Sequence, residues 1–177
     1  APATLADLCR RLADMQASAG PGDTRRLRLL NEAVQFSPDD PLLLFDLGEA
    51  YEEGALNMEA AAVYSRLVAM ELPTDVLKET HLRLALLWGD ALGDTGRYRE
   101  HLRIACDLDP ADRAMRRQYI QLLEDDQDWD AMADQLREVV ALAEDPEERS
   151  GALVELAAVL RKQLERDDSL VEARLRD

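Results

Sequence analysis

Four prolines recur along this sequence at an almost constant interval. Pro38, Pro73, Pro110 and Pro146 are 35, 37 and 36 residues apart, and each follows an apolar stretch with helical periodicity. Proline ends a helix at such a position because it lacks the amide hydrogen and its ring clashes with the preceding turn. A helix stop repeated at one interval indicates a chain built from repeated helical units.

The unit that ends at Pro73 shows the content of one repeat most clearly. Apolar residues of its first half recur with the spacing of a helical face: Leu44, Leu47, Gly48 and Tyr51. Those of its second half do the same: Ala60, Tyr64, Leu67 and Val68. Only a few residues, around 54–57, separate the two halves. The unit is therefore predicted to be an antiparallel pair of helices joined by a tight turn.

This unit resembles a tetratricopeptide repeat, whose signature is W-x-x-L-G-x-x-Y, then A-x-x-x-F, then a closing proline. The matching residues are Leu47, Gly48, Tyr51, Ala60, Tyr64 and Pro73, with Leu44 in the tryptophan place. The resemblance implies an all-α fold, a right-handed α-solenoid of antiparallel helix hairpins. It also implies that the small residue at Gly48 lets the two helices of a hairpin approach closely.

The same register extends over the whole chain. The small-residue position recurs at steps of 35, 37, 35 and 37 residues: Ala13, Gly48, Ala85, Ile120 and Ala157. We expect a single solenoid over 1–177 with about 4.5 repeats, at approximately 4–38, 39–73, 74–110, 111–146 and, in part, 147–177. Because Ile120 is bulky where the family prefers glycine or alanine, the fourth hairpin is expected to be splayed.

Alternate repeats share a register of 72 residues, which suggests duplication of a unit of two hairpins. The pattern resembles the repeat arrays of large bacterial scaffold proteins, whose longer first helices end near Leu-Gly-Asp or Leu-Glu-Arg, as at 92–94 and 164–166. In the fifth repeat we expect a first helix over 147–165 and only a stub, 168–176, for the second. Such an end favours an excerpt of a longer array, or pairing of the end helices with another copy.

The charge of the chain restricts its partners. Asp and Glu number 37 against 21 Lys and Arg, which gives a net charge of −16. Such a surface disfavours nucleic acids and anionic membranes and favours basic partners. The sequence contains no apolar run of about 20 residues and no visible signal peptide. The two cysteines have no metal-binding spacing and are expected to be thiols rather than a disulfide. Because no signal is visible and the cysteines are expected to be thiols, we expect a cytoplasmic protein.

The motif search predicts a protein that is not an enzyme and has no cofactor. Gly-rich phosphate loops, H-E-x-x-H and G-x-S-x-G are all missing from the sequence. His81 and His101 fall on the two helices of one hairpin and could meet, but a pair without further ligands is a poor metal site. The acidic stretch 124–130 lacks the glycine and the final glutamate of a calcium loop. It fits the turn between two helices.

By analogy with the family, a partner would lie on the concave side, which first helices line. The predicted groove positions on that surface are Leu42, Phe45, Glu49, Glu52, Glu79, Leu82, Leu86, Arg117 and Gln121. Further positions on the same faces are Asp7, Arg10, Asp14, Asp90 and Asp125. An apolar centre with an acidic rim suits a basic peptide or protein with apolar anchors. Alternatively, Leu42 and Phe45 pack against a neighbouring hairpin.

The expected function is therefore that of a protein–protein interaction scaffold. Phe45 and Glu49 stand where one subgroup of the family places the Lys and Asn that clamp C-terminal carboxylates, so binding of that kind is not expected. Two alternatives stay open: a structural segment that self-associates through its end helices, and a regulatory domain of a larger multidomain protein.

Overall fold

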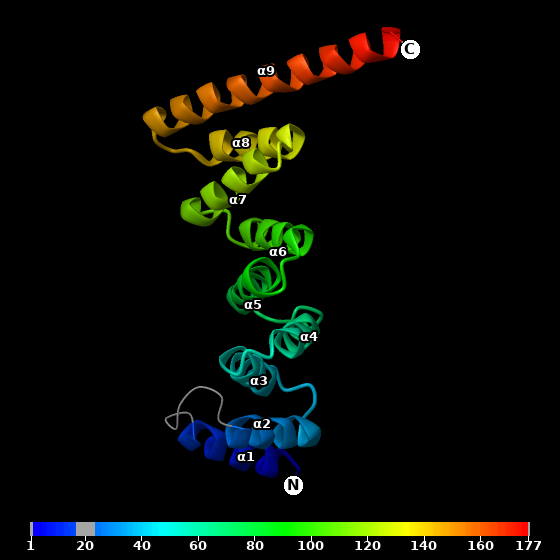
Figure 1. The fold of residues 1–177 in the computed structure, drawn as a ribbon. Helices are drawn as coiled ribbons and strands as arrows, with labels where there is room; N and C mark the ends of the chain where they lie inside the picture. Colours follow the sequence, from blue (N-terminus) through cyan, green and yellow to red (C-terminus); the bar gives the residue numbers. More distant parts are fainter. Residues whose placement is uncertain (1, 17–23, 177) are drawn as a thin grey trace. The chain divides into compact units, whose positions relative to one another are not determined.

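The computed structural model describes residues 2–16 and 24–176, and the residues described form helices and no strand, which confirms the all-α fold class. The chain divides into two compact units, Ala1–Leu108 and Asp109–Asp177. This division lies close to the predicted boundary between the third and fourth repeats at 110. Figure 1 labels the helices along the chain.

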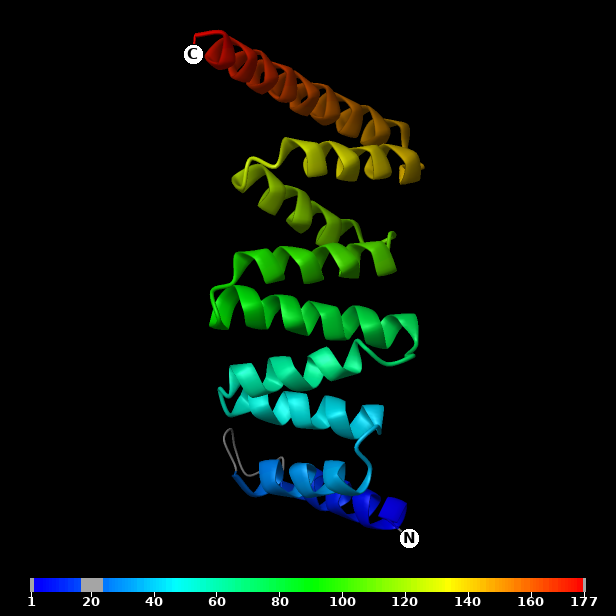
Figure 2. The same ribbon diagram turned by 90° about the vertical axis from the view of Figure 1, so that its right-hand side faces the viewer.

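The first unit consists of three helical hairpins. Its helices are α1 (Pro2–Gln16), α2 (Thr24–Phe36), α3 (Pro41–Glu53), α4 (Asn57–Leu67), α5 (Thr74–Leu86), η2 (Leu87–Ala91) and α6 (Thr95–Leu108). The tightest pairs are α1 with α2, α3 with α4, and α5 with α6, while α2 packs on α3 and α4 on α5. Figure 2 shows α3 to α6 as successive antiparallel layers. The hairpins predicted from the proline interval are therefore present.

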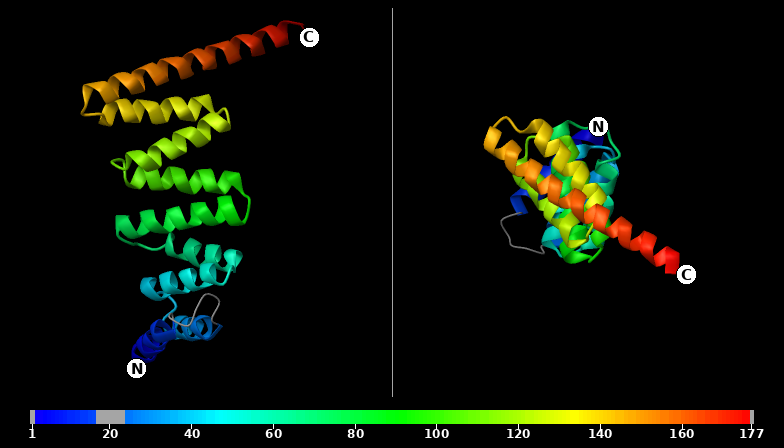
Figure 3. Two further views of the ribbon diagram at one scale, coloured as in Figure 1. Left: turned by 60° about the vertical axis from the view of Figure 1, so that its left-hand side comes forward. Right: turned by 90° about the horizontal axis from the view of Figure 1, so that it is seen from above.

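The second unit consists of α7 (Arg113–Asp125), α8 (Trp129–Leu142) and α9 (Pro146–Arg176). α8 packs against both α7 and α9. Buried residues from all three helices form its core: Met115, Tyr119, Leu123, Met132, Ala133, Leu136, Ala152 and Val159. In the left view of Figure 3, α9 runs back along α8 and continues well past the start of α8.

Aspartates at the turns explain where several helices begin. The Asp40 carboxylate accepts hydrogen bonds from the Leu42 and Leu43 amides at 3.0 and 3.4 Å, and Pro41 occupies the first turn of α3. Asp112 and Asp128 cap α7 and α8 in the same way, by accepting from the amides three residues later. A side-chain cap satisfies an amide that the helix leaves unpaired. These three aspartates of the turns thus have a structural role.

Gly48 shows why the repeat needs a small residue at this position. A Cβ atom on Gly48 would lie 2.4 Å from Cε1 of Tyr64, which is fully buried. The Tyr64 ring of α4 therefore lies directly on the backbone of α3. This contact is the close helix approach that the resemblance implied, and it lies in the centre of the core of the first unit.

The first helices of the third and fifth repeats are longer than the others, and they end differently. α5 continues into the π-helical turn η2 and stops before Gly93, which has a φ of 70°. This agrees with the expected end near 92–94. α9 instead runs without a break through 165–168, so the predicted stub over 168–176 is wrong. No glycine or proline lies in that stretch, and nothing in it forces a turn.

Candidate functional site

The predicted groove residues of the first unit lie on α3 and α5. Leu42 at the start of α3 is 59% exposed, and Leu86 at the end of α5 is 53% exposed. Phe45 and Leu82 are half-buried. The Phe45 ring lies 5.8 Å from the Tyr64 ring and packs against the core of the unit. Phe45 thus packs against the core while part of its side chain stays accessible.

Arg83, which was not among the predicted groove residues, links the predicted carboxylates. Its guanidinium lies 3.0 Å from Glu49, 3.5 Å from Glu52 and 3.0 Å from Glu79. The guanidinium carbon also lies 5.6 Å from the centre of the Phe45 ring, within the range of a cation–π contact. Four predicted residues from two helices are therefore brought together by one cation of this chain.

The charges of this cluster shift the protonation of its members. Partial burial disfavours the charged form of Arg83, but the hydrogen bond to Glu79 and the Glu52 and Glu49 charges outweigh it and raise its pKa. Burial raises the pKa of the Tyr64 hydroxyl well above its usual range, and Glu52 raises it further. Arg83 therefore stays charged and Tyr64 stays neutral. One signal for Arg83 was available, since Glu79 and Arg83 are four residues apart on one helix.

The remaining predicted positions of the first unit do not belong to the cluster around Arg83. Arg10 of α1 forms an ion pair with Asp46 of α3 at 2.7 Å. Asp7 and Asp90 are exposed. The side chain of Asp14 lies outside the described residues.

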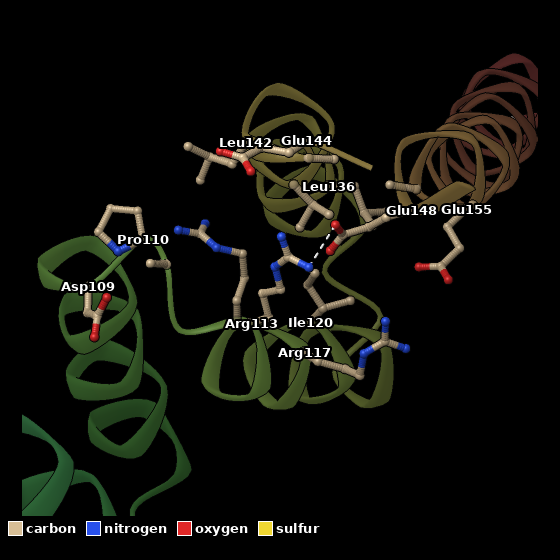
Figure 4. Close-up of a pocket in the computed structure, with 16 residues that line it drawn as sticks. Asp109, Pro110, Arg113, Arg117, Ile120, Leu136, Leu142, Glu144, Glu148 and Glu155 are labelled. Carbon is tan, nitrogen blue, oxygen red and sulfur yellow. Dashed lines mark ion pairs between the residues drawn. The ribbon is translucent and has the colours of Figure 1, made fainter. Parts of the chain in front are cut away.

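In the second unit the predicted residues separate. Gln121 donates a hydrogen bond to Asp125 at 3.1 Å on the exposed face of α7. Arg117 instead lines a pocket between α7, α8 and α9, together with the half-buried Ile120. Figure 4 shows Arg113, Arg117 and Ile120 on one side of this pocket and Glu148 and Glu155 on the other. Sequence reasoning predicted that Ile120 would splay this hairpin, but it did not predict a pocket.

The pocket has a volume of about 590 Å³. Its apolar lining includes Ile120 of α7, Leu136, Val139 and Leu142 of the second half of α8, and Ala143 directly after α8. The α9 side contributes Glu148, Gly151, Ala152 and Glu155, and the start of the unit contributes Asp109, Pro110 and Ala111. A cavity of this size lies within the range of small-ligand and side-chain sites.

His81 and His101 do meet in the α5–α6 hairpin. Their Nδ1 atoms are 3.0 Å apart and the ring centres are 5.2 Å apart. Burial, and then the charge of His101, lower the pKa of His81 to about 4, and burial also lowers the pKa of His101. Within the described part of the chain, no group of three or more His, Cys, Asp or Glu side chains could hold a metal ion. The pair packs between two helices.

Among residues 2–16 and 24–176, no helix combines the length and the apolarity that crossing a membrane requires.

Comparison with known proteins identifies the fold. No protein-family model matches the sequence, and no curated protein matches it either. Among solved structures, the MamA protein matches with a TM-score of 0.61 and 14% identity, over 95% of this chain and 94% of MamA. YrrB, described as a TPR protein with an unusual peptide-binding site, matches with a TM-score of 0.57 and 16% identity. That match covers 92% of this chain and 79% of YrrB. The chain therefore has the tetratricopeptide-repeat fold, an all-α helical-repeat solenoid.

Proposed function

We propose that this chain is an interaction scaffold that binds a partner protein or peptide through the face shared by α3 and α5. The observation that carries this proposal is the exposure of Leu42 and Leu86 on the helices whose carboxylates surround Arg83. Exposed apolar side chains beside a charged rim are typical of sites where one protein docks on another. The description of YrrB as a peptide-binding protein with this fold supports a partner of the same kind.

The charges indicate which partner would fit best. Glu49, Glu52 and Glu79 contribute three negative charges to this face, and Arg83 returns one positive charge. The surplus is negative, as it is for the whole chain, with a net charge of −16. Long-range attraction then favours a basic segment. Leu42 and Leu86 would supply the apolar contacts that such a segment needs for affinity.

A double substitution, Leu42→Ser with Leu86→Ser, tests this surface. Both side chains are exposed, so their removal should leave the fold intact while it weakens capture of a basic partner by about tenfold or more. Proteins captured from a cell extract by the tagged chain would be quantified by mass spectrometry. Their affinities for the two versions of the chain would then be measured with purified partners.

The matched control is Met58→Ser, on α4. Met58 is 58% exposed, against 59% for Leu42, but it lies on a second helix. Met58→Ser removes about as much exposed apolar surface as Leu42→Ser alone, so it is compared with each single leucine variant as well as with the double variant. Equal loss of capture in the control and the double variant would contradict the assignment of this face, and so would unchanged capture in both.

A specific observation also favours the alternative of self-association. α9 carries exposed apolar residues at helical spacing: Leu153, Val154, Leu160 and Leu164. In the repeat register, Leu153 and Leu160 correspond to Leu44 and Tyr51 of α3, which pack in the core of the first unit. Sedimentation velocity over a wide range of concentrations would decide this alternative. A monomer at every concentration would count against it.

A further inference from the structure

One of the residues that line the pocket of the second unit has no side chain. Gly151 lies inside α9 and lines the pocket, and a Cβ atom placed on it would meet nothing within 4 Å. Close packing therefore does not require glycine here, in contrast to Gly48. A glycine in a helix interior destabilises the helix by about 0.5–1 kcal/mol relative to alanine. Because Gly151 has no side chain, the space in front of the apolar wall of the pocket, formed by Ile120, Leu136 and Val139, stays empty.

The arginines of the pocket are largely engaged within the protein. Arg113 pairs with Glu148 at 2.9 Å, and the buried Arg116 donates a hydrogen bond to Gln135 at 2.9 Å. Four acids line the pocket against these two arginines and Arg117, which leaves a formal charge of −1. Three arginines on one helix therefore do not make this an anion site.

Two carboxylates remain open to a ligand. Glu144 and Glu155 are exposed, line the pocket, and make no hydrogen bond or ion pair with the described residues. Figure 4 places Glu144 at the end of α8 and Glu155 on α9, on either side of Glu148. Apolar lining residues in the same pocket as two carboxylates that have no partner among the described residues are complementary to an apolar side chain with a neighbouring cation.

We infer that this pocket binds a peptide segment that carries a large apolar side chain next to lysine or arginine. The apolar side chain contacts Ile120, Leu136 and Val139, and the neighbouring cation lies against Glu155 or Glu144. The inference rests on the proposed function and adds to it a defined anchoring point in the second unit. The segment is recognised by the order of its residues, because wall and carboxylates occupy fixed places.

The two isoleucines of the chain allow a direct test. Ile120 lines the pocket, whereas Ile104 lies on α6 in the first unit and serves as an internal control. The intact chain, with 13C-labelled isoleucine methyl groups, would be titrated with the capped peptide GKFKG. We expect a saturable shift of the Ile120 methyl signal and no shift at Ile104. GEFEG and GKSKG should bind at least about fivefold more weakly, since each lacks one of the two contacts.

Two pairs of variants separate pocket binding from general attraction. Gly151→Leu fills the pocket and should abolish the Ile120 shift, whereas Gly151→Ala leaves most of the space and should keep it. Glu155→Lys should weaken GKFKG binding at least about threefold more than Glu165→Lys. Glu165 lies on the same helix, is 70% exposed and does not line the pocket. The two charge changes alter the net charge equally.

The outcomes distinguish this inference from the proposed function. An Ile120 signal that does not move with GKFKG overturns the pocket assignment, and so does a shift that survives Gly151→Leu. Equal affinity for GKFKG and GEFEG overturns the selectivity. In each of these cases, loss of partner capture by Leu42→Ser with Leu86→Ser would still support the scaffold function. Capture that persists in that variant would contradict the scaffold surface, whatever Ile120 reports.

Discussion

Single residues in this chain have roles that their chemistry and their place in the repeat explain. Gly48 and Gly151 are both helical glycines, yet one touches a tyrosine ring and the other faces empty space. The repeat register predicted the first, because the small position and the aromatic position are both part of the signature. It could not predict the second, since the space around Gly151 depends on how far α7 and α8 stand apart from α9.

The two glycines should respond oppositely to the same substitution. Gly48→Ala places a methyl group against Tyr64 and should destabilise the protein by about 1–3 kcal/mol, the usual effect of overpacking a core. Gly151→Ala should stabilise it by up to about 1 kcal/mol, through helix propensity alone. Urea unfolding followed by circular dichroism would measure both. Equal effects of the two changes would contradict the packing described for Gly48.

The paired histidines make stability depend on pH in a defined window. The pKa of His81 is lowered from 6.5 to about 4 in the folded protein, so the unfolded chain binds more protons between these values. The stabilisation is fully present above pH 6.5 and is lost as the pH falls towards 4. The loss should be about 3 kcal/mol. In the variant His81→Asn with His101→Asn, the free energy of unfolding should change less over this window, and an unchanged pH dependence would contradict the assignment.

At the scale of the helices, ion pairs join successive first helices of the first unit. Arg10 joins α1 to α3, and Arg83 joins α5 to α3. The carboxylates of Glu49, Glu52 and Glu79 were predicted from their places on the helix faces. Arg83 was missed because its side chain reaches across to the neighbouring helix, and a register of faces does not describe such a reach. The prediction of a break in α9 was wrong for a related reason. It came from the pattern of the family, and no residue in that stretch stops the helix.

Removal of the Arg83 charge should destabilise the first unit, because the carboxylates that pair with Arg83 would then repel one another. Arg83→Met leaves three acids close together, so the free energy of unfolding should fall by about 1–2 kcal/mol at low salt. The effect should shrink as sodium chloride screens the repulsion. Arg103→Met is a suitable control, because the ion pair of Arg103 with Asp107, at 2.7 Å, lies within α6 on an exposed face. A loss of stability that does not depend on the salt concentration would contradict repulsion among the three carboxylates as its cause.

For the whole molecule, the two compact units should lose their structure separately. The chain has two tryptophans, Trp88 in the first unit and Trp129 in the second. Each ring lies under a cation: Arg97 is 4.0 Å from the centre of the Trp88 ring, and Lys162 is 4.2 Å from that of Trp129. Repeat proteins unfold in parts when the interface between neighbours is weak. In the variants Trp88→Phe and Trp129→Phe, fluorescence reports one unit at a time. We expect the first unit, with its larger core, to unfold at the higher urea concentration. Unfolding transitions at the same urea concentration in the two variants would show that the chain unfolds as one cooperative unit, and would contradict this prediction.

The position of Arg83 has a consequence for the way in which a basic partner would bind to the first unit. The carboxylates there already hold a guanidinium, so an arriving lysine or arginine exchanges one charge contact for another. The net gain from charge is a difference between two similar terms, and it should stay small. Affinity would then come from the leucines at the ends of α3 and α5, while the competition with Arg83 would decide which sequences are rejected.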